Sequence, residues 1–186
     1  EREALKAALG GELGDDLAAL HDRASAVDFT DPAGRGARKV KTQALALIAA
    51  ADPARAADLA AAQYDAADNM TDRQGALMVL AGLDHPARED RLAAFHERYR
   101  GNALAVDKWF TLQALSLHPD VIAQVKALAE HPDFTLRNPN RLRSLYMAFA
   151  GNPKAFHDES GAGYRMIADV ILEVDPITTQ TAARFV

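Results

Sequence analysis

Short turns recur along this chain, and each long segment between them has the apolar spacing of an amphipathic helix. Several turns end in a capping residue followed by a proline, as in Asp52-Pro53 and Asn138-Pro139. Such pairs are typical of helix starts, because the cap accepts a hydrogen bond from a free backbone N–H and proline tolerates the first helical position. The turns are too short for the crossovers that parallel strands need. We therefore expect consecutive, antiparallel helices.

The expected helices come in pairs that recur roughly every 30 to 40 residues, although no fixed-period signature repeats. This organisation predicts an all-α fold, a right-handed HEAT-like α-α superhelix (solenoid) of about ten to twelve antiparallel helices. An irregular helical bundle built from the same helices is the alternative. The expected helical segments are residues 2–9, 15–23, 37–51, 53–67, 71–83, 86–100, 103–117, 121–130, 139–150, 163–175 and 176 onward.

The longest stretch without helical spacing is residues 25–36, which are rich in proline and glycine. An internal boundary, if the chain has one, is expected there, but we interpret residues 1–186 as a single α-superhelical domain. Residues 133–136 are the only short extended candidate. Thr71 is expected to cap the helix that follows the break at residues 68–70.

Both ends of the sequence indicate a piece of a longer protein. Glu1 is not an initiator methionine, and helical spacing begins at once. At the other end, Asp175 and Pro176 are expected to cap and start a last helix. The apolar spacing of that helix continues to the last residue, Val186. We therefore expect a domain that is truncated at both ends.

Composition supports a helical fold and excludes several partners. The chain has 40 alanines but only 8 prolines and 11 glycines, and alanine is the residue that favours helix most. The formal net charge of −5 opposes attraction to phosphates, so no nucleic acid is expected to bind. No apolar run approaches the length of a membrane span, so no membrane contact is expected. The absence of cysteine excludes disulfides and fits a cytoplasmic protein.

Motifs for catalysis or metal binding are incomplete. His96-Glu97 is the only start of an H-E-x-x-H zinc motif, but Arg100 stands where the second histidine is required. The remaining histidines fall mostly at expected helix ends, and neither glycine pair, at residues 34–36 and 161–163, continues into a phosphate-binding loop. No serine lies in G-x-S-x-G. We therefore expect no catalytic residue and no metal ligand in this chain.

The helix that starts at Asn138 is the most informative segment. Arg141 and Arg143 fall on opposite flanks of its apolar stripe, because successive helical residues turn by about 100°. One of the two arginines can therefore reach into an enclosed space. Either arginine can be a solvated side chain with its stem along the stripe, or a guanidinium that binds a carboxylate. The stripe consists of Leu142, Leu145, Tyr146 and Phe149.

Several groups of residues resemble one family closely. The groups are Asn69 to Asp72, Asp107 to Phe110 with Leu112 to Ala114, Asn138 to Arg141 with Arg143 to Leu145, and Ala148 to Gly151 followed by Pro153, Phe156 and His157. They are similar to the C-terminal helical domain of bacterial aminopeptidase N, of the M1 zinc metallopeptidases. The resemblance runs from about residue 4 to residue 186 and is most specific in residues 107–157.

The resemblance implies a role in substrate binding rather than in catalysis. In this family the zinc ion and its H-E-x-x-H motif belong to a separate catalytic domain, over which the helical domain closes. Arg143 and Arg184 match family arginines that face the active-site chamber and contact substrate or product. Arg141 is interpreted as a solvated helix residue.

Two functions follow as hypotheses. The first is the C-terminal domain of a zinc-dependent aminopeptidase, which lines the substrate chamber while the parent enzyme removes N-terminal residues from peptides. Its partners are then the catalytic domain of the same polypeptide and the peptides themselves, and the isolated chain is not catalytic. The alternative is a free-standing HEAT-like scaffold that binds a protein along its concave face.

Overall fold

The computed structural model describes residues 1–28, 30–32 and 34–186, and these residues form helices joined by turns. Since α9, η1 and α10 follow one another without a break, the described chain has twelve helices. It contains no strand, and residues 133–136 form turn and irregular structure. None of the described helices is both long and apolar enough to cross a lipid bilayer.

The chain divides into two compact units, Glu1–Ala94 and Phe95–Val186. The division falls inside helix α6 (Pro86–Tyr99). The expectation that an internal boundary falls at residues 25–36 is therefore wrong. The described residues of that stretch lie within the first unit, between two helices that pack on each other.

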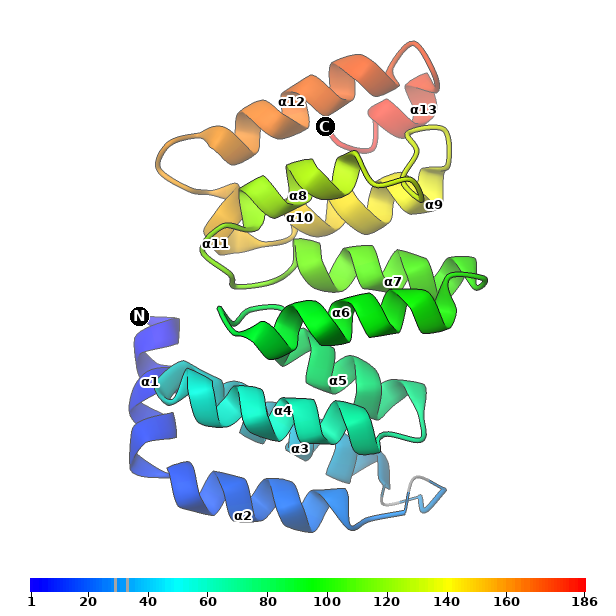
Figure 1. Cartoon of the computed structure of the whole chain (residues 1–186). Coiled ribbons are helices and arrows are strands. Elements are labelled where there is room, and N and C mark those ends of the chain that lie inside the picture. The colour runs from blue at the N-terminus through cyan, green and yellow to red at the C-terminus, as the bar shows by residue number, and fades with distance from the viewer. Residues whose placement is uncertain (29, 33) are drawn as a thin grey trace. The chain divides into compact units, whose positions relative to one another are not determined.

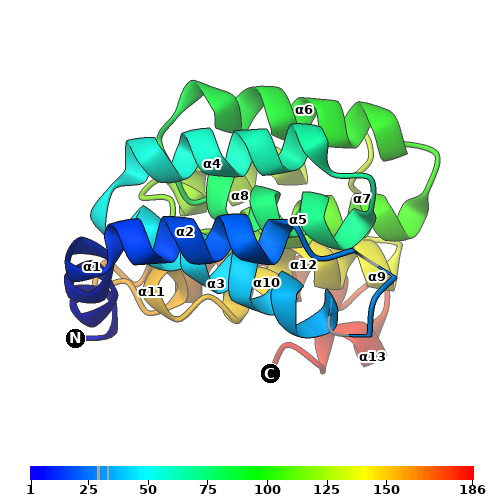
Figure 2. The same cartoon turned by 90° about the horizontal axis from the view of Figure 1, so that it is seen from below.

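The first unit is built on α3, which packs against the two helices before it and the two after it. Figures 1 and 2 show α1 lying across one end of α2, α3 and α4. Small side chains fill the buried face of α4, where Ala56, Ala57 and Ala60 have no exposed surface. Besides the first part of α6, the helices are α1 (Arg2–Glu12), α2 (Gly14–Ser25), α3 (Gly34–Ala51), α4 (Pro53–Ala66) and α5 (Met70–Leu80).

The second unit has a core of aromatic and aliphatic side chains. Phe95, Phe110 and Phe149 are fully buried, and so are Leu142 and Leu145. After the end of α6, its helices are α7 (Ala103–Ala114), α8 (Val121–Ala129), α9 (Pro139–Leu142), the π-helical turn η1 (Arg143–Met147), α10 (Ala148–Ala150), α11 (Pro153–Phe156), α12 (Ala162–Val174) and α13 (Thr179–Ala182).

Cap residues explain where several helices begin. The side chains of Asp52, Asn102 and Asn138 each accept a hydrogen bond from a backbone N–H in the first turn of the following helix. Asn69, rather than the expected Thr71, caps α5, because its side chain accepts a hydrogen bond from the N–H of Asp72. An amide two residues earlier satisfies a free N–H of the first turn as well as a threonine hydroxyl does.

Candidate functional site

The candidate site is centred on α9, the helix that Asn138 caps and that begins at Pro139. Oδ1 of Asn138 accepts hydrogen bonds from the backbone N–H groups of Asn140, at 3.0 Å, and Arg141, at 3.3 Å. Pro139 occupies the first helical position. The predicted stripe is confirmed, since Leu142, Leu145, Tyr146 and Phe149 are all buried. The cap and the stripe together fix the direction in which the two flanking arginines leave the helix.

A π-helical turn, η1, follows directly after α9 and starts at Arg143. The Ser144 hydroxyl donates to the carbonyl of Arg141 at 2.8 Å, and the Thr111 hydroxyl from α7 donates to the carbonyl of Ser144 at 3.1 Å. These side chains satisfy backbone groups where the helix widens. Such turns are rare and frequently occur at functional sites. Hydrophobic spacing gives no signal for them, so the sequence did not predict this one.

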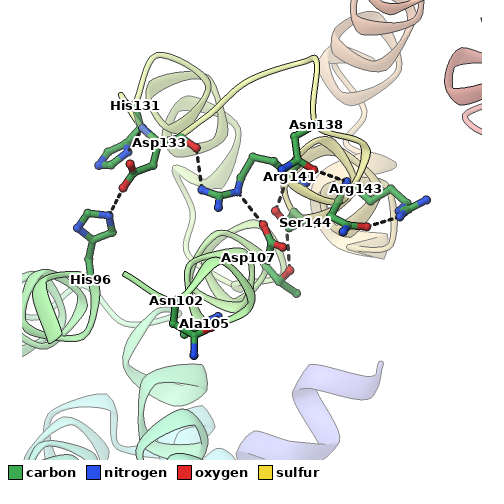
Figure 3. A network of polar contacts seen from close by, with 12 residues as sticks. His96, Asn102, Ala105, Asp107, His131, Asp133, Asn138, Arg141, Arg143 and Ser144 are labelled. Carbon is green, nitrogen blue, oxygen red and sulfur yellow. Dashed lines mark hydrogen bonds and ion pairs between the residues drawn. The ribbon is translucent and has the colours of Figure 1, made fainter. Parts of the chain in front are cut away.

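Arg141 is enclosed, and the expectation that it is solvated is wrong. Its residue exposure is 7%. Its Nε donates to Asp107 Oδ1 at 2.7 Å, and its Nη1 donates to the carbonyl of Asp133 at 2.7 Å. The guanidinium carbon also lies 5.1 Å from the centre of the Phe110 ring. Figure 3 shows the guanidinium between Asp107 and Asp133.

The burial of Arg141 has a physical reason that lies outside its own helix. Asp107 on α7 supplies the opposite charge, and its side chain is only 17% exposed. The segment after α8 supplies a backbone carbonyl, at Asp133, that is in no helix. A charge can be buried only where such partners compensate for lost hydration. Both partners come from other parts of the chain.

Arg143 points away from this network (Figure 3). Its side chain is half-buried and donates a hydrogen bond to the side-chain oxygen of Asn140. In the part of the chain that the structure describes, no carboxylate forms an ion pair with Arg143. A guanidinium has five N–H donors, so most of them remain for a ligand. Of the two predicted substrate-binding arginines, Arg143 is therefore the better placed.

Arg184 lies in a different environment from the expected one. The expected helix starting at Pro176 is wrong, because α13 begins at Thr179 and ends at Ala182. Arg184 follows in a turn, is exposed, and its backbone N–H bonds to the carbonyl of Thr181. No hydrogen bond or ion pair between described residues connects its side chain with Arg143.

A second polar group, missed by the sequence analysis, lies beside Arg141. His96 Nε2 and Asp133 Oδ2 are 2.6 Å apart, and the His96 and His131 rings are 4.9 Å apart between their centres. Trp109 contacts both rings. Burial lowers the pKa of His131, the nearby His96 and Arg141 lower it further, and Asp133 opposes them. His96 is half-buried, because the segment after α8 covers it.

The residues around His96 do not fit the catalytic zinc of a metallopeptidase. That site needs two histidines one turn apart on one helix, with a glutamate as general base. Arg100 occupies the second position, and its Nη1 lies 3.1 Å from Glu97 Oε2. Arginine in place of the second histidine removes one of the required metal ligands. No step of zinc-dependent hydrolysis can be assigned to this helix.

Known proteins match the chain along its whole length. Residues 1–186 match the family model described as "Domain of unknown function (DUF3458_C) ARM repeats". Aminopeptidase N of Caulobacter vibrioides is 41% identical over 189 residues, and aminopeptidase N of Escherichia coli is 34% identical over 187 residues. Both alignments cover 100% of this chain, but the chain spans only 22% of the length of either relative.

A solved structure agrees with the sequence comparisons. The crystal structure of Legionella pneumophila aminopeptidase A in complex with aspartic acid superposes with a TM-score of 0.88 at 30% identity. The match covers 99% of this chain and 23% of that one. The ARM-repeat description and the twelve helices confirm the predicted HEAT-like helical fold. The chain therefore belongs to the DUF3458_C family of ARM-repeat domains, and it is the C-terminal helical domain of the bacterial aminopeptidase N type.

Proposed function

We propose that this chain is the domain that closes over the active site of a cytoplasmic, zinc-dependent aminopeptidase and lines its substrate chamber. The parent enzyme then removes N-terminal residues from peptides, with its zinc held by the catalytic domain of the same polypeptide. The family membership and the names of the relatives support this proposal. The chain spans only 22% of the length of either relative, and this supports the proposal too, because most of each relative is left for other domains.

The observation that carries the proposal is the guanidinium of Arg143 at the start of the π-helical turn, which forms no ion pair with any residue that the structure describes. A peptide bound at a catalytic metal by its amino end has its carboxylate directed away from that metal. Arginine binds carboxylates with two parallel hydrogen bonds. Asn140 holds one edge of the guanidinium and leaves its other donors available. Arg143 is thus suited to bind the carboxylate at the C-terminal end of a short peptide. Arg184 is proposed as a second, exposed cation along the path by which peptides reach the active site.

Replacing Arg143 by alanine in the full-length enzyme should raise the KM for short peptides with a free carboxylate. A hydrogen bond to a charged group contributes about 1.5 to 3 kcal/mol, which is roughly a tenfold to hundredfold change. Steady-state kinetics on a tripeptide and on a small chromogenic amide should separate the two substrate types, because the amide has no carboxylate to bind. Arg143→Lys should recover part of the loss, and Arg184→Ala should give a smaller effect of the same kind.

Arg137→Ala is the matched control, since Arg137 is an exposed arginine just before the same helix. It should leave both substrates unaffected. Equal losses on the peptide and the amide for Arg143→Ala would mean that this arginine supports packing between domains. No loss on either substrate would mean that Arg143 is only solvated.

The 186-residue chain alone should not hydrolyse an alanyl amide, with or without added zinc. Water activation needs a metal held by a full set of ligands, and the only partial motif lacks its second histidine because Arg100 stands in its place. A chromogenic assay on the purified chain, with the full-length enzyme as the positive control, tests this. Zinc-dependent turnover by the chain that is lost in Glu97→Gln would contradict it.

A further inference from the structure

We propose that His96, His131 and Asp133 form a binding site for a divalent transition-metal ion, such as zinc, that is separate from any peptidase centre. Each of the three residues offers one ligand atom, and these atoms all lie within 4.8 Å of one another. Two imidazoles with a carboxylate form a common ligand set for zinc and related ions, and three protein ligands leave a position for water. This inference does not depend on the proposed peptidase function.

The three ligands come from two segments of the chain, a helix and a turn that the fold holds in place. His96 lies on α6, and His131 and Asp133 lie in the turn that follows α8. Arg141 holds that turn in place through the carbonyl of Asp133. Metal-binding constellations need such support, because ligands that are free to move do not keep the required geometry. Figure 3 shows the carboxylate of Asp133 directed toward His96, with His131 beside it.

The charge balance of the cluster suits a cation. The permanent positive charge of Arg141 acts on His131, and Asp107 is paired with Arg141 at 2.7 Å. Asp133 is therefore the negatively charged group beside the two imidazoles. Trp109 packs against both rings and shields one side of the cluster. Asp133 itself is exposed, which gives a metal ion a route in from solvent.

Metal binding needs three small adjustments. The hydrogen bond of 2.6 Å between His96 Nε2 and Asp133 Oδ2 must open when both atoms bind the metal, because two ligand atoms of a tetrahedral zinc ion lie about 3.4 Å apart. Ligands of one zinc ion lie at most about 4.2 Å apart, because each is about 2.1 Å from the metal. The widest pair in this cluster must therefore approach slightly. His131 Nδ1 now accepts a hydrogen bond from the backbone N–H of Asp133 at 3.1 Å. That bond must open, whichever ring nitrogen binds the metal, since a ligating imidazole needs a free lone pair on one nitrogen and carries its proton on the other.

The test is isothermal titration calorimetry, in which zinc is added to the metal-free 186-residue chain at neutral pH. We expect one equivalent to bind. His96→Gln and Asp133→Asn should each weaken binding by at least about tenfold, since even an outer partner of a metal site accounts for a loss of roughly tenfold to a hundredfold. Cobalt should bind at the same place and give a visible absorption spectrum that both variants lose.

His157→Gln is the matched control, because His157 is exposed and bonds to Tyr164 rather than to the cluster. It should bind zinc as the unaltered chain does. Asp133→Asn keeps the shape of the side chain, and circular dichroism checks that every variant is folded. Absence of binding by the unaltered folded chain would overturn the proposal. So would unchanged zinc affinity in both His96→Gln and Asp133→Asn, since the three residues would then form only hydrogen-bonded contacts.

Discussion

Replacing Arg141 by alanine should lower the free energy of unfolding by about 3 to 5 kcal/mol, the loss seen when one partner of a buried ion pair is removed. The variant leaves the carboxylate of Asp107 without its charge partner and the carbonyl of Asp133 without its donor. It also removes the guanidinium from the face of Phe110. Urea unfolding followed by the fluorescence of Trp109, the single tryptophan and a member of the same unit, measures the change.

Arg143→Ala is the control for this prediction, because Arg143 lies two residues away on the same helix and has no ion pair among the described residues. It should change the unfolding free energy by about 0.5 kcal/mol or less. The double variant Arg141→Met with Asp107→Leu should recover much of the loss, since apolar replacement of a whole buried pair is often neutral. Similar small effects for Arg141→Ala and Arg143→Ala would contradict the ion pair.

The two arginines show what helical spacing can and cannot predict. The spacing correctly placed Arg141 and Arg143 on opposite flanks of a buried stripe, because that arrangement depends only on the geometry of one helix. It could not show which flank is enclosed. Asp107 and Asp133, which decide this, lie 34 and 8 residues away from Arg141 along the chain. The expectation that Arg141 is solvated was therefore wrong.

The same distinction applies to the rest of the fold. Helices with regular apolar spacing were predicted close to their observed bounds, as α4 and α8 show. Pro176 was wrongly expected to start a helix, because a proline fits a turn as well as a first helical position. The boundary between the two units was also misplaced, since it falls inside a continuous helix, α6, where no turn residue marks it.

The polar cluster of His96, His131 and Asp133 was the least predictable feature. His96 is 37 residues from Asp133 along the chain, so no short motif connects them. The only local signal was the sequence His131-Pro132-Asp133, which is typical of a turn. These residues meet only because α6 packs against the segment after α8, so their spacing along the sequence follows no rule. Their proximity had to come from the structure.

Replacing Gly10 by alanine should destabilise the first unit by about 1 to 3 kcal/mol, the usual cost of overpacking. An added Cβ would lie 2.2 Å from the carbonyl oxygen of Leu47 and 2.9 Å from the Cβ of Ala51, both on α3. The first of these atoms belongs to the backbone, so it cannot move unless α1 and α3 separate. Gly10 is thus required by the close approach of the two helices and not by its own backbone conformation, which is helical.

Gly11 provides a control of opposite sign in the same helix. A Cβ added at Gly11 meets nothing within 4 Å, so Gly11→Ala should stabilise the chain by about 0.5 to 1 kcal/mol through its better helix propensity. Urea unfolding monitored by circular dichroism compares the two variants. Removing the Ala51 methyl group in the double variant Gly10→Ala with Ala51→Gly should give little recovery, because the Leu47 carbonyl remains in the way. Stabilisation by Gly10→Ala as large as that by Gly11→Ala would show instead that α1 does not pack closely on α3.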